Sequence, residues 1–392
     1  MLSSQSSGLV FYGFSRLTFC ITLSAWKKMK NRKAEVGQRI PVTLGNIAPL
    51  SLTPFRSGRM ALVCEGGGQR GIFTAGVLDE FMRAQFNPFH LYFGTSAGAQ
   101  NLSAYLCNQP GYGRKVIMRY TTRREFFDPL RFVRGGNLID LDWLVESTAA
   151  RMPLQMDTSA RLFDSGKSFY MCACRGDDYT PGYFSPTKQN WLDIIRASSA
   201  IPGFYRTGVT LEGINYLDGG ISDAIPVQEA AKRGAKTIVV IRTVPSQMYY
   251  TPQWFKRMER WLGESSLQPL VNLVQHHETS YSAIQQFIEK PPGKLRIIEI
   301  YPPKPLHSMA LGSRIPALRE DYKTGQLCGR YFLATVGKLL AATPPLLRHS
   351  SRIAVPETVV VPPAPVANDT HVAEVISAPQ ANDTTFTDED LA

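Results

Sequence analysis

The sequence predicts a three-layer α/β/α fold with a mostly parallel central sheet. Short apolar runs of strand length recur along the chain, at 60–64, 90–94, 168–173, 214–217, 237–242 and 295–301. Segments with apolar residues at helical spacing lie between several of these runs, as in doubly wound α/β folds. Glycine-rich turns follow the first two runs, at junctions where unpaired backbone N–H groups favour negative charge.

Composition divides the chain into four parts. With 392 residues, 44% of them hydrophobic, it is long enough to bury a large core. We expect the α/β domain over residues 37–245 and a mainly helical C-terminal extension over 246–342. Pro, Ala, Val, Asn and Thr dominate residues 343–392, which predicts a disordered tail. The six cysteines show no C-x-x-C pair or zinc spacing, which fits a reducing, cytoplasmic compartment.

Residues 1–36 differ from the rest and are predicted to lie outside the core. The stretch from Leu9 to Trp26 is rich in apolar residues but contains Arg16, and a basic cluster follows it at 27–33. A secretory signal carries its positive charge before the apolar run, and a charge near the middle disfavours a membrane span. The segment is either an interfacial anchor or the product of a start codon assigned too far upstream.

A single hydroxyl is held in a G-x-S-x-G turn between the apolar run 90–94 and a run of small residues at 97–106. A serine at a tight strand-to-helix turn has its Oγ exposed at the end of a sheet, as a nucleophile requires. Small neighbours permit the strained backbone of such a turn. We therefore predict Ser96 as the nucleophile, in a turn formed by Gly94, Thr95, Ala97 and Gly98.

A glycine loop at residues 65–71, Glu-Gly-Gly-Gly-Gln-Arg-Gly, follows the apolar run 60–64 and precedes a helical segment. Its backbone N–H groups are suited to a phosphate or to the oxyanion that forms when a serine attacks an ester. The loop also fits the dinucleotide fingerprint, but that fingerprint requires an acidic residue where this chain has the serine turn. We predict an oxyanion site formed by Gly66, Gly67, Gly68, Arg70 and Gly71.

The third motif is Asp218-Gly219-Gly220, an aspartate turn that follows the apolar run 214–217. Alone, an Asp-Gly-Gly sequence is usually a plain turn. Together and in this order, the three motifs resemble the patatin-like phospholipase family, which pairs a glycine-rich oxyanion loop with a G-x-S-x-G serine and a D-G-A or D-G-G aspartate. The resemblance covers about residues 59–242, includes the segment 197–204, and indicates a bacterial member with a helical C-terminal extension. Many members have Asp where this chain has Glu65.

The resemblance implies a serine acyl-ester hydrolase that acts on lipids, of phospholipase A or lysophospholipase type, without metal or cofactor. Ser96 would attack the acyl carbonyl and Asp218 would act as general base. A carboxylate is a weaker base than imidazole, so such a dyad requires a direct hydrogen bond in a partly desolvated site. Arg70 either pins the glycine loop or meets a lipid phosphate.

Two other functions are open from the sequence. A Ser-His-Asp esterase would need His276, His277 or His307 to complete a triad, although the histidine-containing oxyanion loop usual in that fold is absent. We interpret the six histidines as structural or exposed, with His277 the main exception. The chain could instead be a catalytically weak lipid-binding or scaffold protein that keeps the fold.

The charge distribution favours anionic surfaces. Residues 1–36 carry +5 and residues 344–392 carry −5, so the part between them holds the whole net charge of +11. Lys and Arg alternate with aromatic residues over 111–134, which suits anionic lipid headgroups and predicts peripheral contact with the inner face of a membrane. A solvated face over buried aromatics is the alternative. Nucleic acid is not expected as a partner because no recognition motif accompanies the basic residues.

Overall fold

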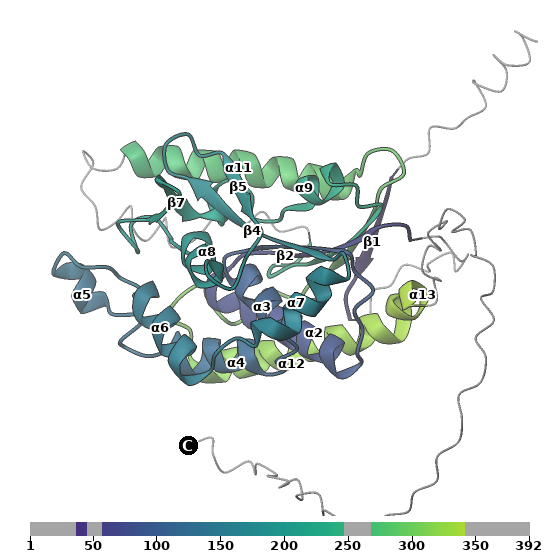
Figure 1. Cartoon of the computed structure of the whole chain (residues 1–392), viewed down its shortest axis with the longest axis horizontal. Coiled ribbons are helices and arrows are strands. Elements are labelled where there is room, and N and C mark those ends of the chain that lie inside the picture. The colour runs from purple at the N-terminus through teal and green to yellow at the C-terminus, as the bar shows by residue number, and fades with distance from the viewer. Residues whose placement is uncertain (1–36, 45–56, 247–267, 342–392) are drawn as a thin grey trace, which may run out of the picture. The chain divides into compact units, whose positions relative to one another are not determined.

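The computed structural model of the chain describes residues 37–44, 57–246 and 268–341 (Figure 1). At its centre is a nine-stranded sheet of order β1-β9-β8-β2-β3-β4-β7-β6, with β5 paired to β4. Six strands that are neighbours in this order, namely β1, β9, β8, β2, β3 and β4, are parallel to one another. The strands β5, β6 and β7 run antiparallel to their neighbours. The predicted mostly parallel sheet is therefore confirmed. The strands are β1 (Gln38–Val42), β2 (Met60–Cys64), β3 (Leu91–Thr95), β4 (Ser168–Arg175), β5 (Pro181–Phe184), β6 (Val209–Leu211), β7 (Ile214–Asp218), β8 (Thr237–Ile241) and β9 (Arg296–Ile300).

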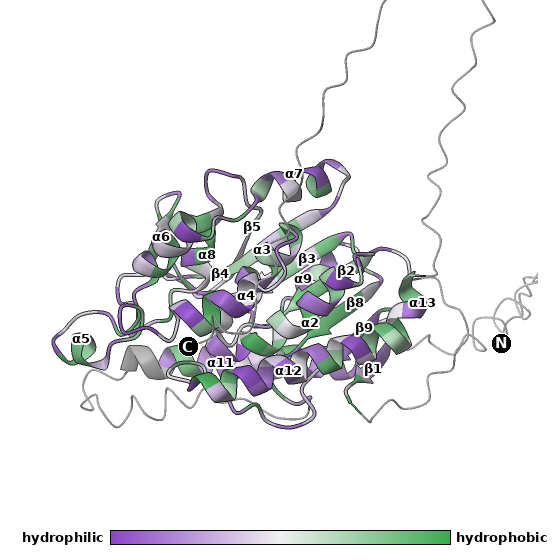
Figure 2. Ribbon diagram, turned by 90° about the horizontal axis from the view of Figure 1, so that it is seen from below, coloured by the Kyte–Doolittle hydropathy of each residue, from purple (hydrophilic) through white to green (hydrophobic). Residues whose placement is uncertain are grey.

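Helices cover both faces of this sheet (Figure 1). On one face lie α9 (Val227–Lys232) and α11 (Gln268–Glu289), and on the other lie α2 (Gly71–Arg83), α3 (Ala97–Leu106) and α12 (Ile315–Phe332). Successive strand residues alternate between two apolar cores, since Leu62 belongs to the core under α2 and α3 and Val63 to the core under α9 and α11. The central strands are accordingly hydrophobic along their length in Figure 2.

Shorter helices surround one end of the sheet and follow the last long helix. They are α4 (Tyr112–Lys115), α5 (Pro129–Val133), α6 (Leu141–Arg151), α7 (Met156–Asp164), α8 (Trp191–Ser198) and α13 (Lys338–Ala341), with π-helical turns at Val116–Tyr120 and Leu333–Gly337. Among the described residues no helix is both long enough and apolar enough to cross a membrane.

All six apolar runs in the sequence form strands, as β2, β3, β4, β7, β8 and β9. The sequence did not predict β1, β5 or β6. For two of these strands the omission has a physical reason. Strand β5 has no buried residue and β6 is only three residues long, so neither shows a buried apolar run in the sequence. The predicted extension 1–36, the predicted tail 343–392 and residues 247–267 of the predicted helical extension lie outside the described residues.

The C-terminal region is built into the same sheet and core. β9 pairs with β1 on one side and β8 on the other. Helix α12 packs along α2 at very short distance, because a Cβ on Gly325 would lie 2.2 Å from the Phe73 carbonyl oxygen and one on Gly76 would lie 2.4 Å from the Tyr322 carbonyl oxygen. The region thus completes the core that supports the serine turn and the glycine loop.

Candidate active site

Ser96 lies at the junction of β3 and α3 in a strained backbone conformation. Its φ is 52° and its ψ is −123°, a region that costs a non-glycine residue free energy. Two buried hydrogen bonds hold the turn: the Ser96 N–H donates to Ser198 Oγ at 2.8 Å, and Thr95 Oγ1 donates to the Asp223 carbonyl at 2.8 Å. A turn of this kind directs the serine hydroxyl away from the end of the sheet.

The predicted turn residues gather closely around Ser96. A Cβ on Gly98 would lie 2.3 Å from the Cys64 carbonyl oxygen, and one on Gly94 would lie 2.7 Å from the backbone of Ala99. Glycine is therefore required at both positions for α3 to begin directly against the ends of β2 and β3. Ala97, the first residue of α3, is buried beside them.

Asp218 is the last residue of β7 and is brought to Ser96 by the strand between them. In β4, Cys172 pairs with Thr95 of β3, and the next residue, Ala173, pairs with Asp218 of β7. Ser96 and Asp218 line the same cavity, and the Ser96 hydroxyl is one of the groups that act to lower the pKa of the Asp218 carboxyl. Two motifs far apart in the sequence thus meet at one edge of the sheet.

The aspartate turn is tightly fixed. The Gly220 N–H donates to Asp218 Oδ1 at 2.7 Å, and the Asp218 N–H donates to the Ala200 carbonyl at 2.8 Å. A Cβ on Gly219 would lie 2.3 Å from the Cys172 carbonyl oxygen, so the chain crosses β4 at a distance that only glycine permits.

The environment of Asp218 makes it a stronger base than an exposed carboxylate. Its side chain is buried, and burial raises its pKa from 3.8 to about 6, although hydrogen bonds from the Gly220 N–H and the Ser96 hydroxyl act to lower it. A free imidazole has a pKa near ~6.5. Asp218 therefore remains ionised at neutral pH while its basicity comes close to that of a histidine.

The glycine loop lies directly beside the serine. A Cβ on Gly66 would lie 3.5 Å from the Ser96 Cβ. Two of the predicted donors are already paired, since the Gly66 N–H donates to the Ala224 carbonyl at 3.2 Å and the Gly71 N–H to carbonyls within the loop. Within the described residues the N–H groups of Gly67 and Gly68 have no acceptor, and both glycines line a cavity with Ser96. These two amides are also the ones that we expect to hold the oxyanion, and that role stays a prediction.

Arg70 packs against the loop itself. It is buried, and its Nη2 lies 3.3 Å from the position of a Cβ on Gly67. Arg70 is also among the residues that line the cavity containing Asp218. Arg70 therefore lies against the glycine loop and beside this cavity, and its role in binding or in loop support stays a prediction.

Glu65 anchors the start of the loop in a buried polar network. Its carboxylate accepts hydrogen bonds from the Thr243 N–H, from Arg242 Nε at 3.2 Å and from the Tyr281 hydroxyl at 2.6 Å. Arg242 also forms a buried ion pair with Glu299 of β9. The residue that departs from the usual aspartate thus ties the loop to β8, β9 and α11.

The C-terminal region holds the loop from its other side. The Gln69 N–H donates to the Ala310 carbonyl at 2.8 Å, and Gln69 Oε1 accepts from the Ser313 N–H at 2.7 Å. Gly68 has a φ of 58°, and a Cβ there would lie 2.2 Å from the Ala310 carbonyl oxygen. Ala310 and Ser313 could not be predicted as supports of the loop, because both act through backbone atoms that any residue carries.

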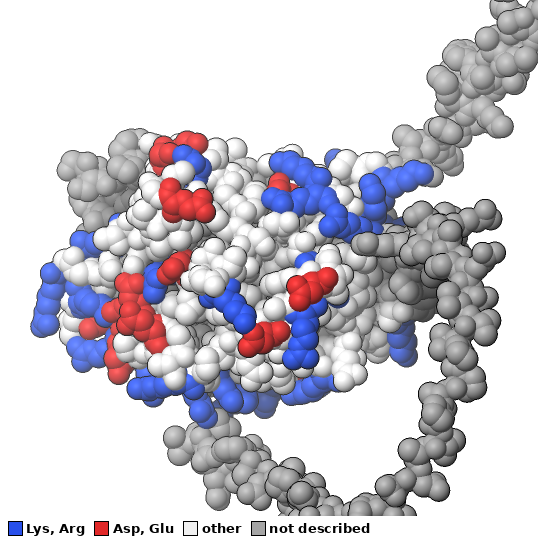
Figure 3. All heavy atoms as spheres, in the orientation of Figure 1, with Lys and Arg blue, Asp and Glu red and all other residues white. Residues whose placement is uncertain are grey.

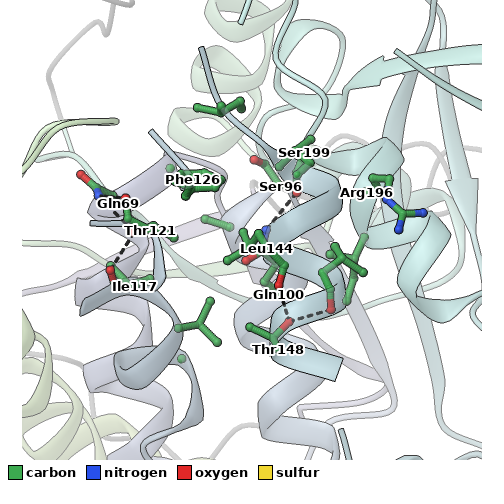
Figure 4. A pocket seen from close by; sticks show the side chains of 18 of the residues that line it. Gln69, Ser96, Gln100, Ile117, Thr121, Phe126, Leu144, Thr148, Arg196 and Ser199 are labelled. Carbon is green, nitrogen blue, oxygen red and sulfur yellow. Dashed lines mark hydrogen bonds between the residues drawn. The ribbon is translucent and has the colours of Figure 1, made fainter. Parts of the chain in front are cut away.

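Ser96 lies where two cavities meet. We call them the apolar cavity and the aspartate cavity. Figure 4 shows the apolar cavity, where Phe126, Leu144 and Ile117 lie among the side chains around Ser96. The aspartate cavity contains Asp218, Arg70 and the glycine loop. Residues that line both are Gly68, Ser96, Ile201 and Leu311.

One histidine enters the aspartate cavity. His277 of α11 lines it, with Nδ1 2.6 Å from the Gly220 carbonyl oxygen. The neighbouring His276 instead lies against the Tyr179 ring, at 5.7 Å between ring centroids. His307 is exposed, and His90 directly precedes β3, at the opposite end of the strand from Ser96. Of the histidines considered for a triad, His277 is the one that the fold brings to the site.

A family model described as patatin-like phospholipase matches residues 62–231, from β2 into α9. This stretch includes the glycine loop, the serine turn and the aspartate turn. The chain belongs to the patatin-like phospholipase family. The resemblance inferred from the three motifs is therefore confirmed, and the family supports a lipid acyl hydrolase.

The rest of this patatin-like chain also has relatives. A second model, a domain of unknown function named DUF6363, matches residues 267–341. The chain is similar to the "Uncharacterized protein YjjU" of Escherichia coli (strain K12), with 85% identity over 357 residues that make up 91% of this chain and 100% of that protein.

Two solved structures show more distant similarity to this patatin-like protein. VipD from Legionella pneumophila has 13% sequence identity and a TM-score of 0.35, covering 73% of this chain and 67% of VipD. Human GIVD cytosolic phospholipase A2, solved with methyl gamma-linolenyl fluorophosphonate and terbium chloride, has 8% identity and a TM-score of 0.37, covering 73% and 60%. Neither similarity is close enough to transfer residue roles.

Proposed function

We propose that the protein is a serine lipid acyl hydrolase of phospholipase A or lysophospholipase type, in which Ser96 and Asp218 form the catalytic dyad. The observation that carries the proposal is the convergence of Ser96 and the buried Asp218 carboxyl on one cavity, where the Ser96 hydroxyl acts on the pKa of that carboxyl. Gly67 and Gly68 line the same cavity as these two residues, and Ser96 also lines the apolar cavity. Nucleophile, base, oxyanion donors and acyl site are thus adjacent.

In the first step, Ser96 Oγ attacks the acyl carbonyl carbon while Asp218 accepts the hydroxyl proton. The carbonyl oxygen becomes an oxyanion that accepts hydrogen bonds from the N–H groups of Gly67 and Gly68. Each such donor contributes on the order of 3–4 kcal/mol to transition-state stabilisation. The tetrahedral intermediate collapses as the protonated Asp218 returns its proton to the leaving alkoxide, which releases the alcohol.

In the second step, water attacks the acyl-serine ester with Asp218 again as general base. The oxyanion re-forms at the same two amides, and the proton on Asp218 passes to Ser96 Oγ as the carbon–oxygen bond breaks. The free fatty acid and the original serine are the products. Each proton that Asp218 takes is returned within the same step, so the dyad ends each cycle unchanged.

The apolar cavity suits the acyl chain of a lipid. Its lining is dominated by aliphatic side chains from the elements between the Val116–Tyr120 turn and α8, with Phe126 at one side (Figure 4). Burial of each methylene of a chain in such a lining contributes about 0.8 kcal/mol. On the aspartate side, the positive charge of Arg70, which lines that cavity, supports binding of a phosphate headgroup there.

The geometry favours the dyad over a Ser-His-Asp triad. A triad histidine donates from Nδ1 to its carboxylate, whereas His277 Nδ1 is bonded to the carbonyl of Gly220. The raised pKa of Asp218 also removes the main objection to a carboxylate base. We therefore assign proton transfer to Asp218.

The proposal includes contact with an anionic membrane surface through α5. Leu130 and Val133 of this helix are 52% and 68% exposed, and α5 lies between Phe126 and Ile139, which both line the apolar cavity. On the face shown in Figure 3, Lys and Arg side chains gather at the end of the molecule that carries α5. Exposed apolar side chains among arginines fit a bilayer interface with anionic headgroups.

The test is to incubate the purified protein with phospholipids, lysophospholipids and triacylglycerols and to identify products by mass spectrometry. We expect fatty acid release by the wild-type protein and none by Ser96→Ala. Equal release by Ser96→Ala would contradict the assignment of the nucleophile. Lipid binding without hydrolysis by the wild-type protein would instead favour the scaffold function.

A further inference from the structure

We infer that His277, contributed by the C-terminal region, is a positioning residue that fixes the aspartate turn of the catalytic site. The inference rests on the proposed function, because it concerns how Asp218 is held. Its basis is the 2.6 Å contact between His277 Nδ1 and the Gly220 carbonyl oxygen, at the wall of the cavity that contains Ser96.

The direction of this hydrogen bond follows from its partner. A carbonyl oxygen can only accept, so Nδ1 of His277 carries the proton and donates it. Gly220 is then held at both of its polar groups, since its N–H donates to Asp218 Oδ1 at 2.7 Å. The imidazole of His277 is therefore linked to the Asp218 carboxyl by hydrogen bonds to the two polar groups of Gly220.

Helix α11 contacts the aspartate turn at two points on one face. His277 binds the Gly220 carbonyl, and the hydroxyl of Ser280 donates to the Ser222 carbonyl. These two side chains are three residues apart, so they project from the same side of the helix. Because Gly220 has no Cβ to restrict its backbone, contacts from outside the turn are needed to keep it in one conformation.

The inference gives a role to a region whose family model, DUF6363, is a domain of unknown function. Residues 267–341 supply His277 on the aspartate side of the site and Ala310 on the glycine-loop side. The patatin-like match ends before both of these contacts. The C-terminal region would therefore complete the catalytic geometry that the three motifs provide only in part.

The experiment compares three substitutions of His277 with a control at the adjacent residue. His276→Ala removes an imidazole from the same helix turn without touching Gly220. In His277→Asn the amide nitrogen is bonded to Cγ, as Nδ1 is in histidine, so a donor remains at a similar position. In His277→Gln the amide nitrogen lies one bond further from the backbone. Values of kcat and KM are measured with a soluble short-chain nitrophenyl ester, and thermal unfolding midpoints are recorded for each protein.

We expect His277→Ala to lower kcat by roughly 10- to 100-fold, the cost of a small misplacement of a catalytic group, with KM unchanged within about twofold. His277→Asn should recover most of kcat and His277→Gln should not. His276→Ala should match the wild-type protein. A purely structural role would lower the unfolding midpoint without this separation of Asn from Gln.

Three results would overturn the inference. One is a wild-type kcat for His277→Ala, and another is an equal loss for His276→Ala. The third is a folded His277→Asn that is as inactive as His277→Ala, because the ring itself would then be required for proton transfer. If His277→Ala does not fold, the comparison of Asn with Gln decides. An inactive wild-type protein would refute the proposed function, a result distinct from each of these.

Discussion

Replacement of Asp218 by Asn removes a buried charge while it preserves the shape of the side chain. The amide oxygen of Asn can still accept the Gly220 N–H, and its NH2 group can donate to the Ser96 hydroxyl, which also accepts hydrogen bonds. The variant therefore separates the cost of an ionised carboxyl from the loss of hydrogen bonds. We expect it to be inactive and more stable than the wild-type protein at alkaline pH.

The magnitude follows from the pKa of Asp218, which burial raises from 3.8 to about 6. A raised pKa means that the folded state disfavours the ionised form, so stability is lost as pH rises from about 4 through 6. At about 1.36 kcal/mol for each pKa unit, the ionised carboxyl destabilises the fold by about 3 kcal/mol at pH 8. At pH 5 the destabilisation by the ionised carboxyl is about half as large as at pH 8.

Urea unfolding at pH 8 and pH 5 measures the difference directly. Asp218→Asn should gain about 3 kcal/mol at pH 8 and about half as much at pH 5. Ser96→Ala, which keeps the charge and loses the hydroxyl, serves as the control and should show no such gain. An Asn variant that is no more stable than the wild-type protein at pH 8, or a gain that does not change with pH, would refute this account of the carboxyl.

Three further predictions concern pH, chain length and membrane contact. Because Asp218 must be ionised to act as a base, log(kcat/KM) should rise with slope one up to pH about 6 and then level off; a flat profile between pH 5 and 8 would contradict this. Leu144→Trp fills the apolar cavity, so it should lower kcat/KM for long-chain nitrophenyl esters by at least about tenfold. It should leave kcat/KM for the acetyl and butyryl esters of the same series unchanged. An unchanged chain-length preference would place the acyl chain elsewhere. The double variant Leu130→Asp, Val133→Asp should no longer sediment with anionic vesicles, while its hydrolysis of soluble esters is unaffected. The control is Leu327→Asp, at a residue of α12 that is 47% exposed. Equal losses of sedimentation for the two proteins would exclude α5 as the membrane contact.

The chemical motifs were predictable from the sequence because each is a local pattern at the end of an apolar run. Gly94 and Gly98 marked the serine turn because small residues are required there, and close backbone approaches at both positions explain the requirement. The meeting of Ser96 with Asp218 was predicted from family resemblance. It depends on β4, whose pairing with both β3 and β7 has no signature in any single segment.

The supports of the site were not predictable in the same way. Ala310 and Ser313 act through backbone groups, which any sequence provides. The ion pair of Glu65 with Arg242 joins the residues that directly follow β2 and β8, and its specificity arises from tertiary contacts. The sequence distinguishes His277 as the main exception among the histidines, but its approach to Gly220 depends on how α11 packs over the aspartate turn.

Covalent labelling with a fluorophosphonate probe tests the central claim most directly, because an unactivated serine does not react. After labelling and digestion, mass spectrometry should find the adduct on the peptide that contains Ser96 in the wild-type protein. Asp218→Asn should react slower by roughly 10²- to 10⁴-fold, the usual contribution of a general base. An adduct on another residue, no adduct at all, or an equal labelling rate in Asp218→Asn would contradict a Ser96–Asp218 dyad.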